Sequence, residues 1–147
     1  MTTLAELQKV LAANKGKLIT VIGTTCTGKT TILKDIPDGV ALSDLAPALT
    51  KEQKAYIMQT PLTREISETV ATLVGKRAVL TAGKPAFGTV IASNTELIVY
   101  MKISDELLAK RAKLRNVQFS DAKTMQSWIE EKIAESGLPC VEVEVKE

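Results

Sequence analysis

The feature that most constrains this chain is a short glycine-framed stretch near its start. It reads Gly23-Thr24-Thr25-Cys26-Thr27-Gly28-Lys29-Thr30. The apolar, partly β-branched run 18–22 precedes it and predicts a buried strand, while residues 30–36 after it have a helical pattern. The chain must therefore turn within these residues from a strand directly into a helix.

The spacing G-x-x-x-x-G-K-T is typical of a loop that wraps a phosphate chain. Glycines leave room for the phosphates, successive backbone N–H groups point inward, and the following helix adds its positive N-terminal end. Lys29 would place its ammonium group on the β- and γ-phosphates, and the Thr30 hydroxyl would bind Mg²⁺. We therefore expect residues 23–31, Thr31 included, to bind ATP or another nucleoside triphosphate. The alternative is a glycine-rich turn before an ordinary helix.

Composition limits the classes of function. A length of 147 residues predicts one domain, 1–147. With 19 Lys and Arg against 17 Asp and Glu and no long basic run, nucleic acid is not an expected partner. The chain has no His and two distant cysteines, Cys26 and Cys140, which excludes His-based catalysis and a zinc site and favours a reduced, cytoplasmic protein. No apolar run reaches membrane-spanning length, so a membrane is not expected either. The oligomeric state stays open.

The remaining pattern alternates between strands and helices. We expect strands near 18–22, 40–42, 78–82, 96–103 and 141–145, and helices near 4–14, 30–36, 51–59, 61–75, from 105 onward and from 120 to 137, with a weak helical turn around 87–92. Capping boxes are predicted at Thr3 and at Thr50. Such alternation predicts an α/β fold, a three-layer sandwich around a five-stranded parallel sheet with right-handed crossovers. Ligands then bind at the carboxyl ends of the strands, where we expect the glycine loop, Asp44 and residues 81–84.

A second stretch carries a resemblance to a known family. Residues 98–115 read I-V-Y-M-K-I-S-D-E-L-L-A-K-R-A-K-L-R. A strand, an acidic helix cap and two arginines four residues apart are similar to the adenylate-kinase pattern. Together with the glycine loop, the chain resembles a small P-loop kinase of the nucleoside-monophosphate kinase or shikimate kinase type.

The resemblance implies both a fold and an activity. It implies the strand order 2-3-1-4-5 and transfer of the ATP γ-phosphoryl group, with Mg²⁺, to a small acceptor such as a nucleoside monophosphate. It also implies that Arg111 and Arg115 flank the lid, here a short one near 116–120, and contact the transferring phosphates. Residues four apart share one helix face, so both guanidinium groups can reach one anion, although a solvated basic face has the same pattern.

The chain departs from the family pattern at the expected third strand. The family usually has there an acid that holds Mg²⁺ through water, whereas this sequence has Thr81-Ala82-Gly83-Lys84. This departure leaves a second hypothesis open, a nucleotide-binding module or slow NTPase without kinase activity.

The acceptor side is inferred from position alone, and we expect it within 44–75. Asp44 follows the second strand, where it would contact the acceptor, act as a base, or merely cap a helix. Arg64, in the first turn of its helix, would bind an anion or remain a surface arginine, and Lys84 would bind substrate phosphate or end a turn. Trp128 is expected in the core rather than as a platform for a base.

Overall fold

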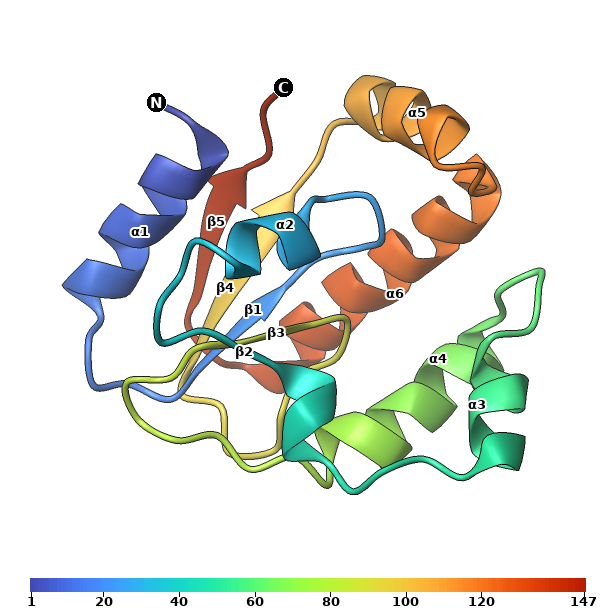
Figure 1. Cartoon of the computed structure of the whole chain (residues 1–147), viewed down its shortest axis with the longest axis horizontal. Coiled ribbons are helices and arrows are strands. Elements are labelled where there is room, and N and C mark those ends of the chain that lie inside the picture. Colours follow the sequence, from blue (N-terminus) through green and yellow to red (C-terminus); the bar gives the residue numbers. More distant parts are fainter.

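The computed structural model describes residues 1–147 and contains one five-stranded sheet (Figure 1). Its strands are β1 (Ile19–Ile22), β2 (Val40–Ala41), β3 (Ala86–Gly88), β4 (Leu97–Lys102) and β5 (Cys140–Glu144). Their order is β2-β3-β1-β4-β5, and every neighbouring pair is parallel. The α/β class and the predicted order 2-3-1-4-5 are confirmed. All five carboxyl ends consequently lie at one edge of the sheet.

Helices cover both faces of the sheet and make it the middle of three layers (Figure 1). They are α1 (Thr3–Ala13), α2 (Lys29–Leu33), η1 (Leu42–Leu45), α3 (Lys51–Ile57), α4 (Arg64–Val70), η2 (Ala71–Gly75), α5 (Asp105–Leu114) and α6 (Phe119–Ser136). Alternate residues of β4 face opposite layers: Val99 packs with Leu7 of α1 and Leu108 of α5, whereas Ile98 packs with Ile129 of α6. No helix combines the length and the apolar composition needed to cross a bilayer.

Several predicted helix ends are confirmed by their hydrogen bonds. The Thr50 hydroxyl accepts from the Gln53 N–H at 3.1 Å, and the Gln53 side chain accepts from the Thr50 N–H at 2.9 Å. Ser104 caps α5, because its hydroxyl accepts from the Leu107 N–H at 3.2 Å. Both caps satisfy backbone donors that would otherwise have no partner within the helix.

Other predicted ends are wrong by a few residues. The cap of α1 is Thr2, not Thr3, and its hydroxyl accepts from the Ala5 N–H at 3.1 Å. The helix expected from Pro61 begins at Arg64, after the cap Thr63. Residues 34–36 do not continue α2, which ends at Leu33. In each case a nearby hydroxyl or turn decided the boundary, which periodicity locates only approximately.

The predicted third strand is wrong. Residues 78–80 form no strand. The Leu80 N–H donates instead to Asn94 Oδ1 at 3.0 Å, and the Leu80 carbonyl accepts from Asn94 Nδ2 at 3.2 Å. A bridge between Thr81 and Lys84 then turns the chain into β3, within the segment where a helical turn was expected. Residues 81–84 therefore precede the amino end of β3. The proposed role of Lys84 as a phosphate ligand at the carboxyl edge loses its basis.

Candidate functional site

The glycine loop connects the carboxyl end of β1 to α2, at the edge of the sheet where the carboxyl ends of all five strands lie. Cys26 and Gly28 both have left-handed backbones, with φ angles of 70° and 87°. Gly28 is therefore required by its conformation. Packing also favours glycine at position 23, since a Cβ there would lie 3.2 Å from the Met101 carbonyl oxygen and 3.1 Å from Thr27 Oγ1, which is tighter than usual. Packing is thus a second reason for glycine at this position, beside the space for phosphates expected from the sequence.

Lys29 folds back over the loop and bonds only to neutral oxygens. Its Nζ donates to the carbonyls of Gly23 at 2.6 Å and Thr24 at 2.7 Å, and to Thr27 Oγ1 at 3.2 Å. Burial lowers the pKa of Lys29 from 10.5 to about 7; Cys26 opposes this shift and Arg115 adds to it. The ammonium group is thus held in place without a counter-ion.

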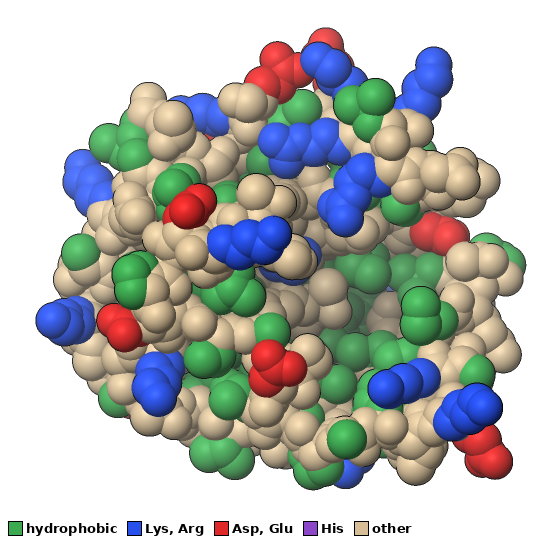
Figure 2. All heavy atoms as spheres, viewed as in Figure 1, with side chains coloured by type: hydrophobic (Ala, Val, Ile, Leu, Met, Phe, Trp, Pro, Cys, Tyr) green, Lys and Arg blue, Asp and Glu red, His purple; other side chains and the backbone are tan.

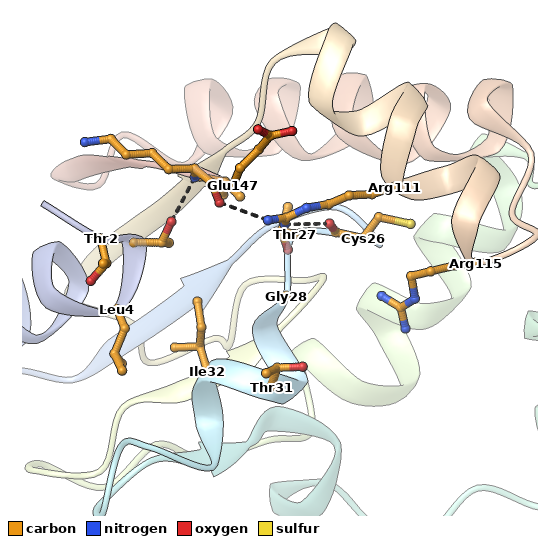
Figure 3. Close-up of a pocket in the computed structure, with 13 residues that line it drawn as sticks. Thr2, Leu4, Cys26, Thr27, Gly28, Thr31, Ile32, Arg111, Arg115 and Glu147 are labelled. Carbon is orange, nitrogen blue, oxygen red and sulfur yellow. Dashed lines mark hydrogen bonds between the residues drawn. The ribbon is translucent and has the colours of Figure 1, made fainter.

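Two further cations reach the loop from α5. Arg111 donates from Nη1 to the Cys26 carbonyl at 3.2 Å and from Nη2 to the Lys146 carbonyl at 2.9 Å (Figure 3). The Arg115 side chain, one turn later, points towards the side of the loop where α2 begins and makes no hydrogen bond (Figure 3). Neither arginine nor Lys29 forms an ion pair with a carboxylate. Three cationic side chains therefore converge on the loop with their charge unmatched.

A pocket of about 560 Å³ lies beside the loop, bordered by the start of α1 and by residues 145–147 (Figure 3). Cys26, Thr27 and Gly28 line one side together with Thr31 and the two arginines. Leu4, Ile32 and Val145 contribute apolar side chains. The pocket thus combines a cationic margin along the loop with an apolar wall, which suits a ligand that carries both phosphates and a ring.

Sequence reasoning missed the two chain ends at this site. The Lys146 N–H donates to Thr3 Oγ1 at 2.8 Å, which fixes the start of α1 beside the residues that follow β5. One signal was available, because the carboxyl end of a fifth parallel strand must lie at the same edge as the loop. Nothing in the sequence of α1 indicated that its first turn would border the pocket.

Thr30 fits the role of a single Mg²⁺ ligand. It lies exposed in the first turn of α2, and its hydroxyl makes no side-chain hydrogen bond, so the oxygen is free to bind. The true third strand also ends without an acid, as it continues from Gly88 into Thr89. No group of three or more His, Cys, Asp and Glu side chains forms a metal cluster. Other ligands of the ion would have to be phosphate oxygens and water, the ligands that Mg²⁺ commonly keeps.

The structure places the remaining candidates elsewhere. Asp44 lies exposed in η1 after β2, without a hydrogen bond or ion pair, and is not part of the pocket beside the arginines. Arg64 pairs with Glu131 at 2.6 Å on the surface. Trp128 is 2 % exposed and donates from Nε1 to Glu68 at 2.9 Å, so it lies in the core as expected.

Comparison with known proteins adds no relative: no protein-family model and no curated protein matches the chain. Function must be inferred from the loop and the side chains around it. Chemically, the pocket offers two guanidinium groups and an apolar wall, while the Lys29 ammonium group and the Thr30 hydroxyl belong to the adjoining loop and α2 rather than to the pocket lining. Such a set can hold a polyanion that carries an apolar ring.

Proposed function

We propose that the protein binds a nucleoside triphosphate with Mg²⁺ at residues 23–31 and transfers its γ-phosphoryl group to a small acceptor. The supporting observation is the convergence of Lys29, Arg111 and Arg115 on one loop without a carboxylate partner. Gathering like charges in a partly buried place is unfavourable unless an anion compensates them. The polyphosphate of a nucleotide supplies that charge where the side chains converge.

The pocket accounts for the rest of a nucleotide. With the phosphates against the loop, the ribose and base extend towards Leu4, Ile32 and Val145. The pocket volume of about 560 Å³ lies within the usual range for small-ligand sites, roughly 300–1,000 Å³.

Phosphoryl transfer depends on positioning and on positive charge around the moving group. Lys29 would bind the β- and γ-phosphates. The Arg115 side chain, which makes no other hydrogen bond or ion pair, would bind the γ-phosphate. Arg111 would hold the Cys26 carbonyl outward and so direct the next N–H into the loop. Mg²⁺, held through Thr30, would neutralise charge on the phosphate oxygens. Asp44 remains the candidate base for the acceptor hydroxyl.

The test begins with binding. Calorimetric titration with MgATP and MgGTP should show saturable binding that Lys29→Ala weakens by at least about tenfold, the loss of a charge-assisted contact. Lys76→Ala, which removes an exposed lysine after η2, is the matched control and should bind as the unaltered protein does. Absence of binding to both nucleotides would reject the proposal.

A second candidate function is nucleotide binding, or slow hydrolysis, without transfer. The end of β3 favours it, because Gly88 and Thr89 stand where an acid would assist Mg²⁺. The two candidates differ in one measurement: a kinase forms ADP faster when acceptor is added, whereas a binding module or NTPase forms it at the same rate with or without acceptor.

A further inference from the structure

A second, smaller pocket lies at the same edge of the sheet, between α3, α4, α6 and the residues after β3. Its volume is about 60 Å³, and seven of its nine lining residues are hydrophobic, among them Val70, Met125 and Trp128. The other two are Ser67 and Thr89. It is much smaller than the pocket beside the arginines, about 60 Å³ against about 560 Å³, and suits a small branched group.

Both hydroxyls in this pocket lack partners. Ser67 is only 6 % exposed, yet neither its hydroxyl nor that of Thr89 takes part in a side-chain hydrogen bond. No fully enclosed side-chain oxygen in the protein is left without a partner, so the Ser67 oxygen must reach open space, and the pocket borders it. Two free hydroxyls within apolar walls form the usual pattern of a small-molecule site.

The pocket adjoins the glycine loop through two elements. The Gly23 N–H donates to the Gly88 carbonyl at 3.3 Å, and Thr89 follows directly. Thr24 Oγ1 donates to the Ala122 carbonyl of α6 at 2.8 Å, one turn before Met125. On the face seen in Figure 2, a hollow floored by hydrophobic side chains opens between the α2 region and the lobe of α3 and α4, with Lys and Arg on its upper margin.

Charge distinguishes this pocket from the one beside the arginines. None of its nine lining residues is charged. Two charged groups on the adjacent helix α4 are already paired: Glu68 accepts from Trp128 Nε1 and from Lys132 Nζ at 2.8 Å, and Arg64 is bound to Glu131. An acceptor that put a phosphate or carboxylate inside the pocket would lose its hydration without gaining a cation from the lining residues, which is unfavourable.

We infer that the pocket binds the acceptor, and that this acceptor is an uncharged alcohol with a small apolar group, not a nucleoside monophosphate. This inference rests on the proposed function. The apolar group would fill the space beside Val70 and Trp128, and Ser67 and Thr89 would hydrogen-bond its polar part. In the step, the acceptor oxygen bonds to the γ-phosphorus as the bond to the β–γ bridging oxygen breaks. The bonding electron pair leaves with ADP, and the hydroxyl proton passes to water.

Trp128 is the only tryptophan of the chain and lines the pocket, so its fluorescence reports occupancy. Titration with isoamyl alcohol should give a saturable change. Ser67→Ala and Thr89→Val each remove one hydroxyl and should weaken binding by about three- to tenfold, the effect of one hydrogen bond. Ser127→Ala, an exposed serine on α6, is the control and should leave the dissociation constant unchanged.

Charged comparators test the class. Isovalerate has the same branched carbon skeleton as isoamyl alcohol but carries a carboxylate, and AMP carries a phosphate. Titration with either compound should give no saturable change in Trp128 fluorescence. Tighter binding of either one, or no saturable response to the alcohol, overturns the inference.

Phosphorus NMR with MgATP and isoamyl alcohol should then show a phosphate monoester appearing with ADP. Alcohol binding without ester formation in nucleotide-loaded protein overturns the acceptor role while the nucleotide site stands. Alcohol binding in protein that does not bind MgATP rejects the proposed function instead, and with it the acceptor role.

Discussion

At the scale of single residues, Lys29 shows how the loop is poised for an anion. Two carbonyls and one hydroxyl replace water around its ammonium group. None of these oxygens carries the negative charge that would stabilise a buried ammonium group. Its pKa of about 7 follows from that environment. The residue therefore titrates close to neutral pH, where a lysine ordinarily stays charged.

Nucleotide affinity should depend on pH through this group. Bound phosphate favours the ammonium form and raises the pKa of Lys29, so binding above about pH 7 takes up a proton, and affinity falls by up to about tenfold per pH unit. Below that pH the lysine is already charged, and its contribution is constant. Calorimetry in buffers of different ionisation enthalpy measures the proton uptake.

Lys29→Arg is the comparison for this experiment, because an arginine remains charged throughout the range. Subtracting its pH profile removes the titration of the nucleotide itself. If nucleotide affinity changed with pH in the same way in the unaltered protein and in the arginine variant, a pKa of Lys29 near neutral pH would be contradicted.

The residues of the loop were predicted from the sequence because their chemistry is local. The left-handed backbone at position 28 favours glycine whatever surrounds it, and the fixed spacing in the sequence places the Lys29 side chain over the loop. The constraint on Gly23 could not be predicted, since it comes from Met101 on a distant strand. Likewise, nothing in the sequence near Arg111 indicated that its guanidinium group would donate hydrogen bonds to two carbonyls rather than remain free for phosphate.

At the scale of elements, β3 shows where a sequence pattern misleads. Residues 78–82 have the stronger strand pattern, yet β3 is the short stretch Ala86–Gly88. Small residues are needed there, because a Cβ on Gly88 would lie 2.9 Å from Leu42 Cβ. Longer periodic elements such as β4 and α5 were predicted because their own side chains suffice to determine them. The position of β3 depends instead on contacts with η1, which lies far away in the sequence.

Asn94 should be an important residue for stability. Its side chain pairs with both backbone groups of Leu80, as a neighbouring strand would. Asn94→Ala leaves both groups without partners and should lower the free energy of unfolding by about 1–3 kcal/mol. Urea denaturation measures this, with the exposed Ser93→Ala as control. Equal urea midpoints for the two variants would contradict this prediction, because they would show that water replaces the Asn94 side-chain amide without loss of stability.

At the scale of the whole molecule, alternating strands and helices predicted a parallel sheet with right-handed crossovers, and the resemblance to small P-loop kinases implied the strand order that the sheet has. The misplaced third strand did not change that order, since both segments lie in the same crossover between β2 and β4. The arrangement of the candidate site was less predictable. Its members come from the loop after β1, from α2, α5 and α1, and from the residues after β5, and only the tertiary fold brings these together.

Arg111 and Arg115 should therefore behave differently although they share a helix face. Arg111→Met removes hydrogen bonds to the Cys26 and Lys146 carbonyls, so amide exchange should become faster in both segments even without nucleotide. Arg115→Met removes no hydrogen bond and should leave exchange unchanged. Each variant should weaken MgATP binding, by about tenfold for a charged contact. Identical exchange patterns in the two variants would contradict a bridging role for Arg111.

Both chain ends stand beside the large pocket: Thr2 and Glu147 are among its lining residues (Figures 1 and 3). Polypeptide joined to either end emerges at the mouth of that pocket. A purification tag would thus compete for the same space as a ligand, and histidines in such a tag would add cations and metal affinity to a chain that contains no histidine. Titrations on cleaved and uncleaved preparations should differ for this reason alone.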